Sequence, residues 1–221
     1  MHVRAAMILL LGVALTAQTP SRRVIDFEAD KAGQAPAGFT FALTGSGGPG
    51  AWSVRRDDSS PDRGNVLAQT DADSTSYRFP LAIFEDVSTS DVDISVRFRP
   101  ISGRVDQAAG LVWRYRDANN YYIVRANALE SNVVLYKVEK GKRTDLPVKG
   151  SGRTYGKKAP VPKNTWSQLG VTVRGQLFTV SLNGQGLYQV EDTTFAGAGK
   201  VGLWTKADSV TYFDDLTIVP R

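Results

Sequence analysis

The sequence predicts an all-β protein built as a β-sandwich or a β-barrel, and three observations point to this class. Residues 24–28, 92–99 and 170–174 alternate between apolar and polar side chains, as strands with one buried face do. Glycine, asparagine and aspartate separate such runs at short intervals. No segment shows the 3.6-residue period of an amphipathic helix.

The remaining strands follow in chain order, and turn-forming residues join them. The expected strands cover residues 110–116, 121–127, 133–138, 177–182, 200–205 and 212–219. Residues 117–120 and 139–142 are expected turns, and Asn183-Gly184 favours a type I′ turn because both central residues need positive φ. Residues 44–50 and 147–162 are expected loops; the first matches the dinucleotide pattern G-x-G-x-x-G in letters but lacks the βαβ unit that this pattern requires.

The N-terminus predicts export. Residues 1–4 include Arg4, residues 5–15 are apolar, and small residues follow at Thr16-Ala17. This is the layout of a secretory signal peptide, so we expect residues 1–17 to be a leader and residues 18–221 to form one domain. No later segment reaches the length of a membrane span. The sequence therefore predicts a secreted or periplasmic protein.

The composition excludes several kinds of chemistry. The chain has no cysteine, and its one histidine, His2, lies in the expected leader. A thiol nucleophile, a Ser-His-Asp triad and a histidine-ligated metal site are therefore excluded from the mature chain.

Positive charge is concentrated in one segment. The net charge is +5, while residues 137–163 carry nine basic side chains against two acidic ones. Without a nucleic-acid-binding motif in an exported chain, we expect no nucleic-acid partner. An anionic polysaccharide or acidic surface polymer suits the segment better, and a solvated loop is the alternative.

The expected hairpin at residues 110–127 combines aromatic with cationic and amide side chains. Strand alternation groups Trp113 and Tyr115 apart from Arg114, and groups Tyr122 apart from Arg125. Aromatic rings stack on sugar faces while arginine and asparagine bind hydroxyls, so the hairpin suits a glycan. The alternative is that its aromatic residues belong to the core.

At this hairpin the chain resembles a known superfamily, and the resemblance covers most of residues 24–219. The segments that carry the resemblance are Gly-Leu-Val-Trp-Arg-Tyr-Arg-Asp-Ala-Asn-Asn-Tyr-Tyr from residue 110, Trp-Ser-Gln-Leu from 166, Phe-Thr-Val-Ser-Leu-Asn-Gly from 178, Gly-Lys-Val-Gly-Leu-Trp from 199 and Phe-Asp-Asp-Leu from 213. They resemble the concanavalin A-like and laminin-G-like jelly rolls of bacterial secreted proteins, including domains labelled family 16 glycoside hydrolase or 3-keto-disaccharide hydrolase. The resemblance implies a two-sheet antiparallel jelly-roll sandwich.

The resemblance also implies where ligands bind. The first and last strands of related jelly rolls are neighbours and carry a structural calcium site, for which Glu28, Asp30 and Asp215 are the expected ligands. One sheet of a jelly roll is concave and open to an extended glycan. The candidates for glycan binding there combine ring faces with planar donors: Arg114, Tyr122, Arg125, Asn127, Tyr136 and Trp204.

The carboxylates of catalytic relatives are not recognisable. Family 16 glucanases carry a Glu-x-Asp-x-x-Glu strand, and residues 91–96 lack both glutamates. Glu85-Asp86 and Glu191-Asp192 are adjacent pairs, which point to opposite faces of a strand. We therefore expect a non-catalytic carbohydrate-binding module. A glycoside hydrolase with carboxylates from separate strands, and an adhesion module that binds protein, remain as alternatives.

Overall fold

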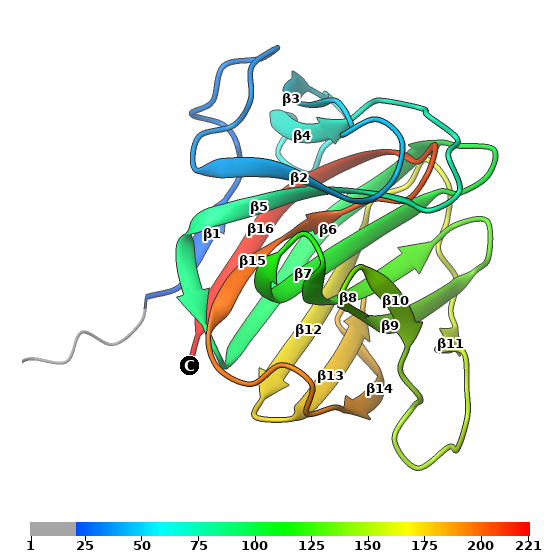
Figure 1. Ribbon diagram of the computed structural model, residues 1–221. Coiled ribbons are helices and arrows are strands. Elements are labelled where there is room, and N and C mark those ends of the chain that lie inside the picture. Colours follow the sequence, from blue (N-terminus) through cyan, green and yellow to red (C-terminus); the bar gives the residue numbers. More distant parts are fainter. Residues whose placement is uncertain (1–20) are drawn as a thin grey trace, which may run out of the picture.

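Two antiparallel sheets of eight strands each pack face to face in the computed structural model, which describes residues 21–221 (Figure 1). Sheet A has the order β14-β13-β12-β6-β16-β4-β3, with β1 also paired to β16, and sheet B has the order β10-β9-β8-β7-β15-β5-β2, with β11 also paired to β9. The strands of sheet A are β1 (Arg23–Ile25), β3 (Trp52–Arg56), β4 (Asn65–Gln69), β6 (Val92–Ser102), β12 (Ser167–Arg174), β13 (Leu177–Leu182), β14 (Gln185–Glu191) and β16 (Val210–Pro220). Those of sheet B are β2 (Phe39–Gly45), β5 (Arg78–Thr89), β7 (Ala108–Asp117), β8 (Asn120–Asn127), β9 (Asn132–Glu139), β10 (Lys142–Asp145), β11 (Lys157–Lys158) and β15 (Gly199–Trp204). The predicted all-β, two-sheet jelly roll is confirmed.

The main core lies between the sheets. Alternate residues of β6 and β12, such as Val96 and Val171, face it with at most 2% of their surface exposed. Trp113 of sheet B meets Phe178 of sheet A edge-on at 5.3 Å between ring centroids. Each such fully buried side chain contributes about 1.5–3 kcal/mol, so this layer provides the main stabilisation of a chain that has no disulfide.

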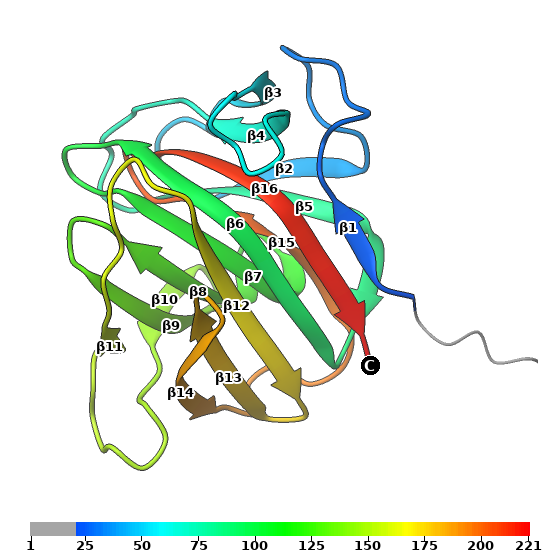
Figure 2. The same ribbon diagram turned by 180° about the vertical axis from the view of Figure 1, so that it is seen from behind.

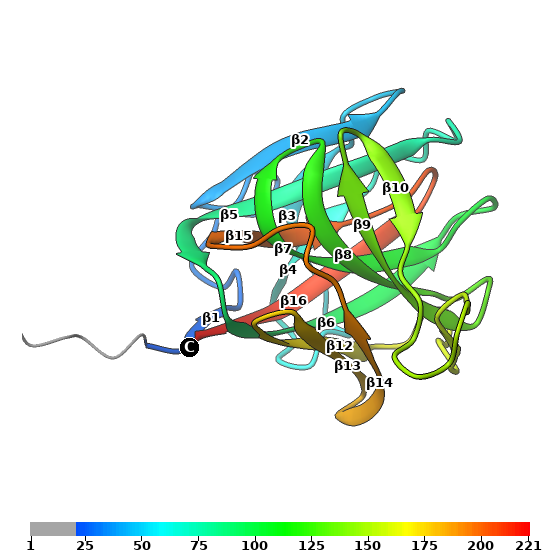
Figure 3. The same ribbon diagram turned by 60° about the horizontal axis from the view of Figure 1, so that its bottom comes forward.

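Sheet B curls strongly (Figure 3). The face of sheet B that is turned away from the main core carries a second apolar cluster. The side chains of this cluster include Phe79, Ile123, Val134, Tyr136 and Trp204. The curl is closed at one end, where the Tyr121 hydroxyl of β8 lies 2.7 Å from that of Thr44 on β2, four strands away in the sheet order. Alternate residues of the same strands therefore pack into two separate apolar clusters, one between the sheets and one on the concave face of sheet B.

The predicted turns are confirmed. Lys140-Gly141 joins β9 to β10 with φ of 51° and 76°, and Asn183-Gly184 joins β13 to β14 with the same two values. These are the positive angles that a two-residue type I′ hairpin requires. The hairpin between β7 and β8 also forms, with Asp117 opposite Asn120.

Several strands differ from the expectation. β4 and the first half of β5 are buried on both faces, so their sequences show no alternation to predict them from. β1 ends at Ile25, whereas the expected strand extended to residue 28. Phe27 has a φ of 62°, which is incompatible with a continuing strand. The expected loop at residues 44–50 begins inside β2, which ends at Gly45.

The first and last strands are neighbours, as the resemblance implied. β1 pairs with β16 through Arg23 opposite Ile218 and Ile25 opposite Leu216 (Figure 2). The expected signal peptide at residues 1–17 lies outside the described residues. Within residues 21–221, no helix is long and apolar enough to cross a membrane.

Candidate functional site

Polar side chains gather on the concave face of sheet B beside the turn that joins β8 to β9. Arg125 of β8 and Tyr136 of β9 face the same side as the second apolar cluster. Glu130 lies in the turn, and Tyr155 reaches over from the segment before β11. We call this group the Arg125 site; its members are Asp106, Arg125, Asn127, Glu130, Asn132, Tyr136, Arg143, Tyr155 and Lys206.

Arg125 is the centre of the site and is fully buried. Its guanidinium donates to Asn132 Oδ1 and Glu130 Oε2, both at 2.7 Å, and to the Tyr155 hydroxyl at 3.0 Å. The Tyr155 and Tyr136 hydroxyls are 2.6 Å apart. These contacts hold the planar guanidinium and two phenol groups in one arrangement, with the Arg125 Nε atom left buried and without a hydrogen-bond partner.

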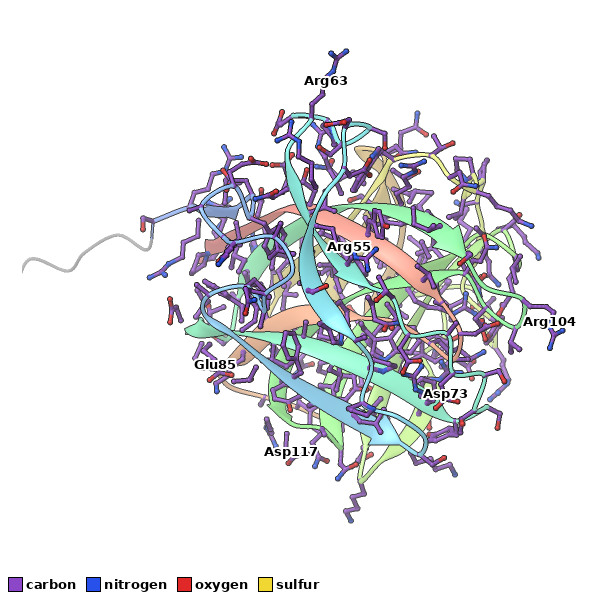
Figure 4. The ribbon with its side chains drawn as sticks, turned by 90° about the horizontal axis from the view of Figure 1, so that it is seen from above. Arg55, Arg63, Asp73, Glu85, Arg104 and Asp117 are labelled. Carbon is purple, nitrogen blue, oxygen red and sulfur yellow. The ribbon has the colours of Figure 1, made fainter. Side chains whose placement is uncertain are left out.

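A second row of contacts supports this arrangement. Asn127 donates from Nδ2 to Asp106 Oδ1 at 2.7 Å and to Glu130 Oε1 at 3.2 Å. Lys206, on the segment after β15, pairs with Asp106 Oδ2 at 2.7 Å. Asp106 itself belongs to the loop between β6 and β7, in which Arg104 points away into solvent (Figure 4).

The site opens to solvent through a few of its members. Tyr155 is 51% exposed, and the side chains of Glu130 and Lys206 are 35% and 21% exposed. Tyr136 below them is buried. A ligand would therefore meet an exposed phenol ring, a carboxylate and an ammonium group, with Arg125 behind them.

The electrostatics favour an ionised Glu130. Burial opposes its ionisation, but the positive charge of Arg125 and hydrogen bonds from Arg125 and Asn132 outweigh burial and lower the Glu130 pKa. A general acid in glycoside hydrolysis needs a raised pKa. Glu130 is thus a fixed hydrogen-bond acceptor, well suited to sugar hydroxyls.

Arg143 of β10 reaches into the curl above the aromatic floor. Its guanidinium carbon lies 4.5 Å from the ring centroids of both Phe79 and Tyr136 and 5.8 Å from that of Trp204. Trp204 is fully buried and stacks on Phe79 at 5.2 Å. Trp204, one of the predicted glycan-binding residues, is therefore separated from solvent by Arg143 and contributes to the floor.

Two other predicted residues lie elsewhere. Arg114 and Tyr122 are 4% and 0% exposed, and both contact Phe178 between the sheets. The guanidinium of Arg114 donates to the backbone carbonyls of Ser90, Phe195 and Gly175. The structure thus brings Arg125, Asn127, Tyr136 and Trp204 together on the concave face and places Arg114 and Tyr122 in the main core, outside the candidate site.

A β-bulge explains why alternation misplaced part of the hairpin. The register between β7 and β8 shifts after Trp113, and Arg114 has a φ of 47°. The extra residue returns Tyr115 to the concave side, where it packs against the second apolar cluster, while Trp113 faces the main core. The expectation that Trp113 and Tyr115 share a face is therefore wrong.

The predicted calcium ligands each have a protein partner. Glu28 Oε1 accepts from Asn65 N at 2.6 Å, Asp30 Oδ1 from Ala37 N at 2.8 Å, and Asp215 Oδ2 pairs with Arg97 at 2.9 Å. Within residues 21–221, no three acidic or histidine side chains are grouped so that they could hold a metal ion. Calcium binding remains a prediction.

Acidic charge is nevertheless in excess near the bulge in β16. Burial raises the pKa of Asp214 to about 7, and the charges of Asp215, Asp62 and Glu28 add to this effect. Burial likewise raises the pKa of Asp215. Asp214 and Asp215 belong to β16, an interior strand of sheet A, whereas the strands that form the Arg125 site belong to sheet B.

The adjacent carboxylate pairs noted in the sequence are engaged in ion pairs and hydrogen bonds. Glu85 accepts from Thr40 and pairs with Lys200 at the margin of the molecule (Figure 4). Glu191 pairs with Lys149 at 2.5 Å, and Asp192 accepts a 2.6 Å hydrogen bond from the Tyr122 hydroxyl. Neither pair faces the Arg125 site.

Part of the basic segment borders a separate groove of about 680 Å³. Its lining includes Val148, Thr154, Lys157 and Tyr188. The Lys157 ammonium group donates to the backbone carbonyl of Leu187 at 3.0 Å. The structure thus uses this lysine to fix the segment against β14.

The sequence reasoning missed Asp106, Glu130, Asn132, Arg143, Tyr155 and Lys206. Most of them lie in turns, in a short edge strand or in the segment predicted to be a loop, where no periodicity marks a side chain as facing the concave sheet. One usable signal was the spacing of Asn127 and Glu130, since the Asn127 side chain accepts from Leu129 N and closes the turn that carries Glu130.

No family model matches the sequence, and no curated protein matches it. Solved structures do match. The carbohydrate binding module CBM66 from Bacillus subtilis is 21% identical with a TM-score of 0.60, over 85% of this chain and 97% of that one. The cellulose induced protein Cip1 is 12% identical with a TM-score of 0.61, over 90% and 97%.

A third match is domain 4 of AbnA, an extracellular arabinanase from Geobacillus stearothermophilus solved with arabinotriose. It is 16% identical with a TM-score of 0.54, over 88% of this chain and 89% of that one. At these identities the likeness establishes the fold. The chain has the two-sheet jelly-roll fold, as the sequence resemblance predicted.

Proposed function

We propose that this protein is an exported carbohydrate-binding module that holds a glycan at the Arg125 site. The observation that carries the proposal is the fixed set of planar hydrogen-bonding groups around Arg125 beside the exposed Tyr155 ring. A sugar needs an apolar surface for its C–H face and rigid donors and acceptors for its hydroxyls. The Arg125 site supplies both.

The structural neighbours support the ligand class. CBM66 is by its name a carbohydrate-binding module, and domain 4 of AbnA was solved with arabinotriose. The extracellular arabinanase among the neighbours also agrees with export, which the N-terminal sequence predicts. We expect the partner to be a polysaccharide or a cell-surface glycan.

Glycoside hydrolysis is the second candidate, and one observation weighs against it at this site. A retaining or inverting enzyme needs one carboxylic acid with a raised pKa near a second carboxylate. At the Arg125 site Glu130 has a lowered pKa, and Asp106 is paired with Lys206. Both carboxylates are better suited to fixing side chains and accepting hydrogen bonds than to donating a proton.

The proposal is tested on a glycan array with the mature protein, followed by titration calorimetry and a reducing-sugar assay on every glycan that binds. We expect retention without sugar release. Tyr155→Phe removes a hydroxyl that contacts Arg125 and Tyr136, and should weaken binding by about 1 kcal/mol, roughly fivefold.

The matched control is Phe41→Ala. Phe41 is 38% exposed and stacks on Trp52, away from the Arg125 site. This variant should bind with unchanged affinity. Binding that is equal in both variants and the wild type would place the glycan elsewhere, and release of reducing sugar would favour the hydrolase.

A further inference from the structure

We infer that the glycan bound at the Arg125 site is acidic, and that Arg143 binds an oxyanion on it, a carboxylate or a sulfate. The inference rests on the proposed function and names the ligand class of the same site. Its starting point is the unusual placement of Arg143. The Arg143 side chain is half-buried, and its guanidinium lies close to three aromatic rings.

Arg143 lacks an anionic partner. Within residues 21–221 its guanidinium forms no ion pair, and its Nη1 atom is buried without a hydrogen-bond partner. The Arg143 side chain is half-buried, and a donor of a charged group that is buried without an acceptor is costly. Aromatic faces compensate part of this cost, but they leave the in-plane N–H groups unsatisfied. An oxyanion accepts from such groups in pairs.

The other charged side chains of the site are paired, which isolates Arg143. Arg125 pairs with Glu130 and Lys206 with Asp106, each at 2.7 Å. The nearby carboxylate on β10, Asp145, lies opposite Tyr136 and has Arg153 as its partner at 3.9 Å. The site therefore has one unpaired cationic group, which a single negative charge on the ligand would neutralise.

Arg143 and Arg125 also face a common neighbour. The guanidinium carbon of Arg125 lies 5.8 Å from the Tyr136 ring centroid, and that of Arg143 lies 4.5 Å from it. The two guanidinium groups therefore border the same phenol ring, with Arg125 buried and Arg143 half-buried. Arg125 Nε and Arg143 Nη1 are both buried donors without a protein acceptor.

The experiment uses pairs of glycans that differ only in charge: polygalacturonate with its methyl-esterified form, and dextran sulfate with dextran. Affinities are measured by affinity electrophoresis and calorimetry at 0.15 M salt. The acidic member of at least one pair should bind about tenfold more tightly, as expected for one charge-assisted hydrogen bond pair. The pair that shows the preference identifies the oxyanion as carboxylate or sulfate.

Three variants assign the preference to Arg143. Arg143→Gln should remove the preference for the acidic glycan, and Arg143→Lys should keep it with weaker binding. Arg153→Gln is the matched control, since its side chain is 90% exposed on the same basic segment, and should leave the preference unchanged. Thermal melts with and without the acidic glycan show whether a variant is folded. If Arg143→Gln does not fold, the weaker binding expected of Arg143→Lys becomes the test of the role of Arg143.

The outcomes separate the inference from the proposed function. Equal affinity for neutral and acidic glycans, or a preference that survives in Arg143→Gln, would overturn the inference while leaving a carbohydrate-binding module in place. Loss of the preference in Arg153→Gln would show that the preference comes from nonspecific electrostatic attraction by the basic segment, and would also overturn the inference. Failure to bind any glycan would refute the proposed function itself.

Discussion

Replacing Arg125 with alanine should destabilise the folded protein strongly, because this arginine is fully buried and organises the site. The substitution removes two 2.7 Å hydrogen bonds and one of 3.0 Å. Removing one partner of a buried ion pair costs about 3–5 kcal/mol. Since the Glu130 side chain is 35% exposed and can regain water, we expect a loss near the lower limit, about 3 kcal/mol.

The loss is measured by urea unfolding and by thermal melting. A change of about 3 kcal/mol corresponds to a melting temperature lower by roughly 6–12 °C for a chain of this size. The control is Arg153→Ala, whose side chain is 90% exposed with an ion pair of 3.9 Å, and which should change stability by less than about 0.5 kcal/mol. A loss below about 1 kcal/mol in Arg125→Ala would show that the buried network is not held as described.

Three further perturbations test other parts of the structure. Asp208 accepts hydrogen bonds from the backbone N–H groups of Arg104, Val105 and Asp106 at 2.7–3.1 Å. Burial opposes ionisation of Asp208, but these hydrogen bonds outweigh burial and lower the Asp208 pKa. The ionised carboxylate therefore stabilises the fold fully above the pKa of the unfolded carboxyl, about 3.9, and this stabilisation is lost as pH falls through the lower pKa of the folded state. The stability advantage of the wild type over Asp208→Asn should therefore shrink from pH 6 to pH 2 in urea titrations, and a constant difference would contradict the shift. The predicted calcium site is tested with a chelator. Removing calcium that had been present at a hundredfold excess over Kd should lower the free energy of unfolding by about 2.7 kcal/mol, and Asp215→Ala should abolish this effect. Equal melting curves with and without chelator would refute the site. Gly202→Ala should destabilise the protein by about 1–3 kcal/mol, because the added Cβ would lie 2.5 Å from the Ala82 carbonyl oxygen, and an unchanged melting temperature would show that β5 and β15 are not packed this closely.

The fold was predictable because its signals are local. Alternation and turn residues located the hairpin of β7 and β8, and the Asn183-Gly184 turn has the positive φ angles that its sequence indicates. β4 was missed because neither of its faces reaches solvent. A strand of this kind lacks the polar positions on which a period of two depends.

The site was predictable only in part, because its residues converge through the curl of sheet B. Alternation placed Arg125 and Asn127 on one face of β8, which is correct. It could not show that this face is concave, that Glu130 and Tyr155 reach Arg125 from separate segments, or that Arg143 lies over Trp204. Arg114 was misassigned to the site because a β-bulge turns its side chain toward Phe178. No residue type in the sequence indicates this bulge.

The most direct test of glycan binding at the Arg125 site is a nuclear magnetic resonance titration of the ¹⁵N-labelled mature protein with a glycan that the array selects. Amide shifts should change for Ala126 to Tyr136 and for Arg143 and Tyr155, since these backbone groups border the site. Saturable changes confined to that region, and absent from the groove lined by Val148 and Tyr188, would agree with the account. Changes centred on that groove or on the outer face of sheet A, with the β8–β9 turn unaffected, would contradict it.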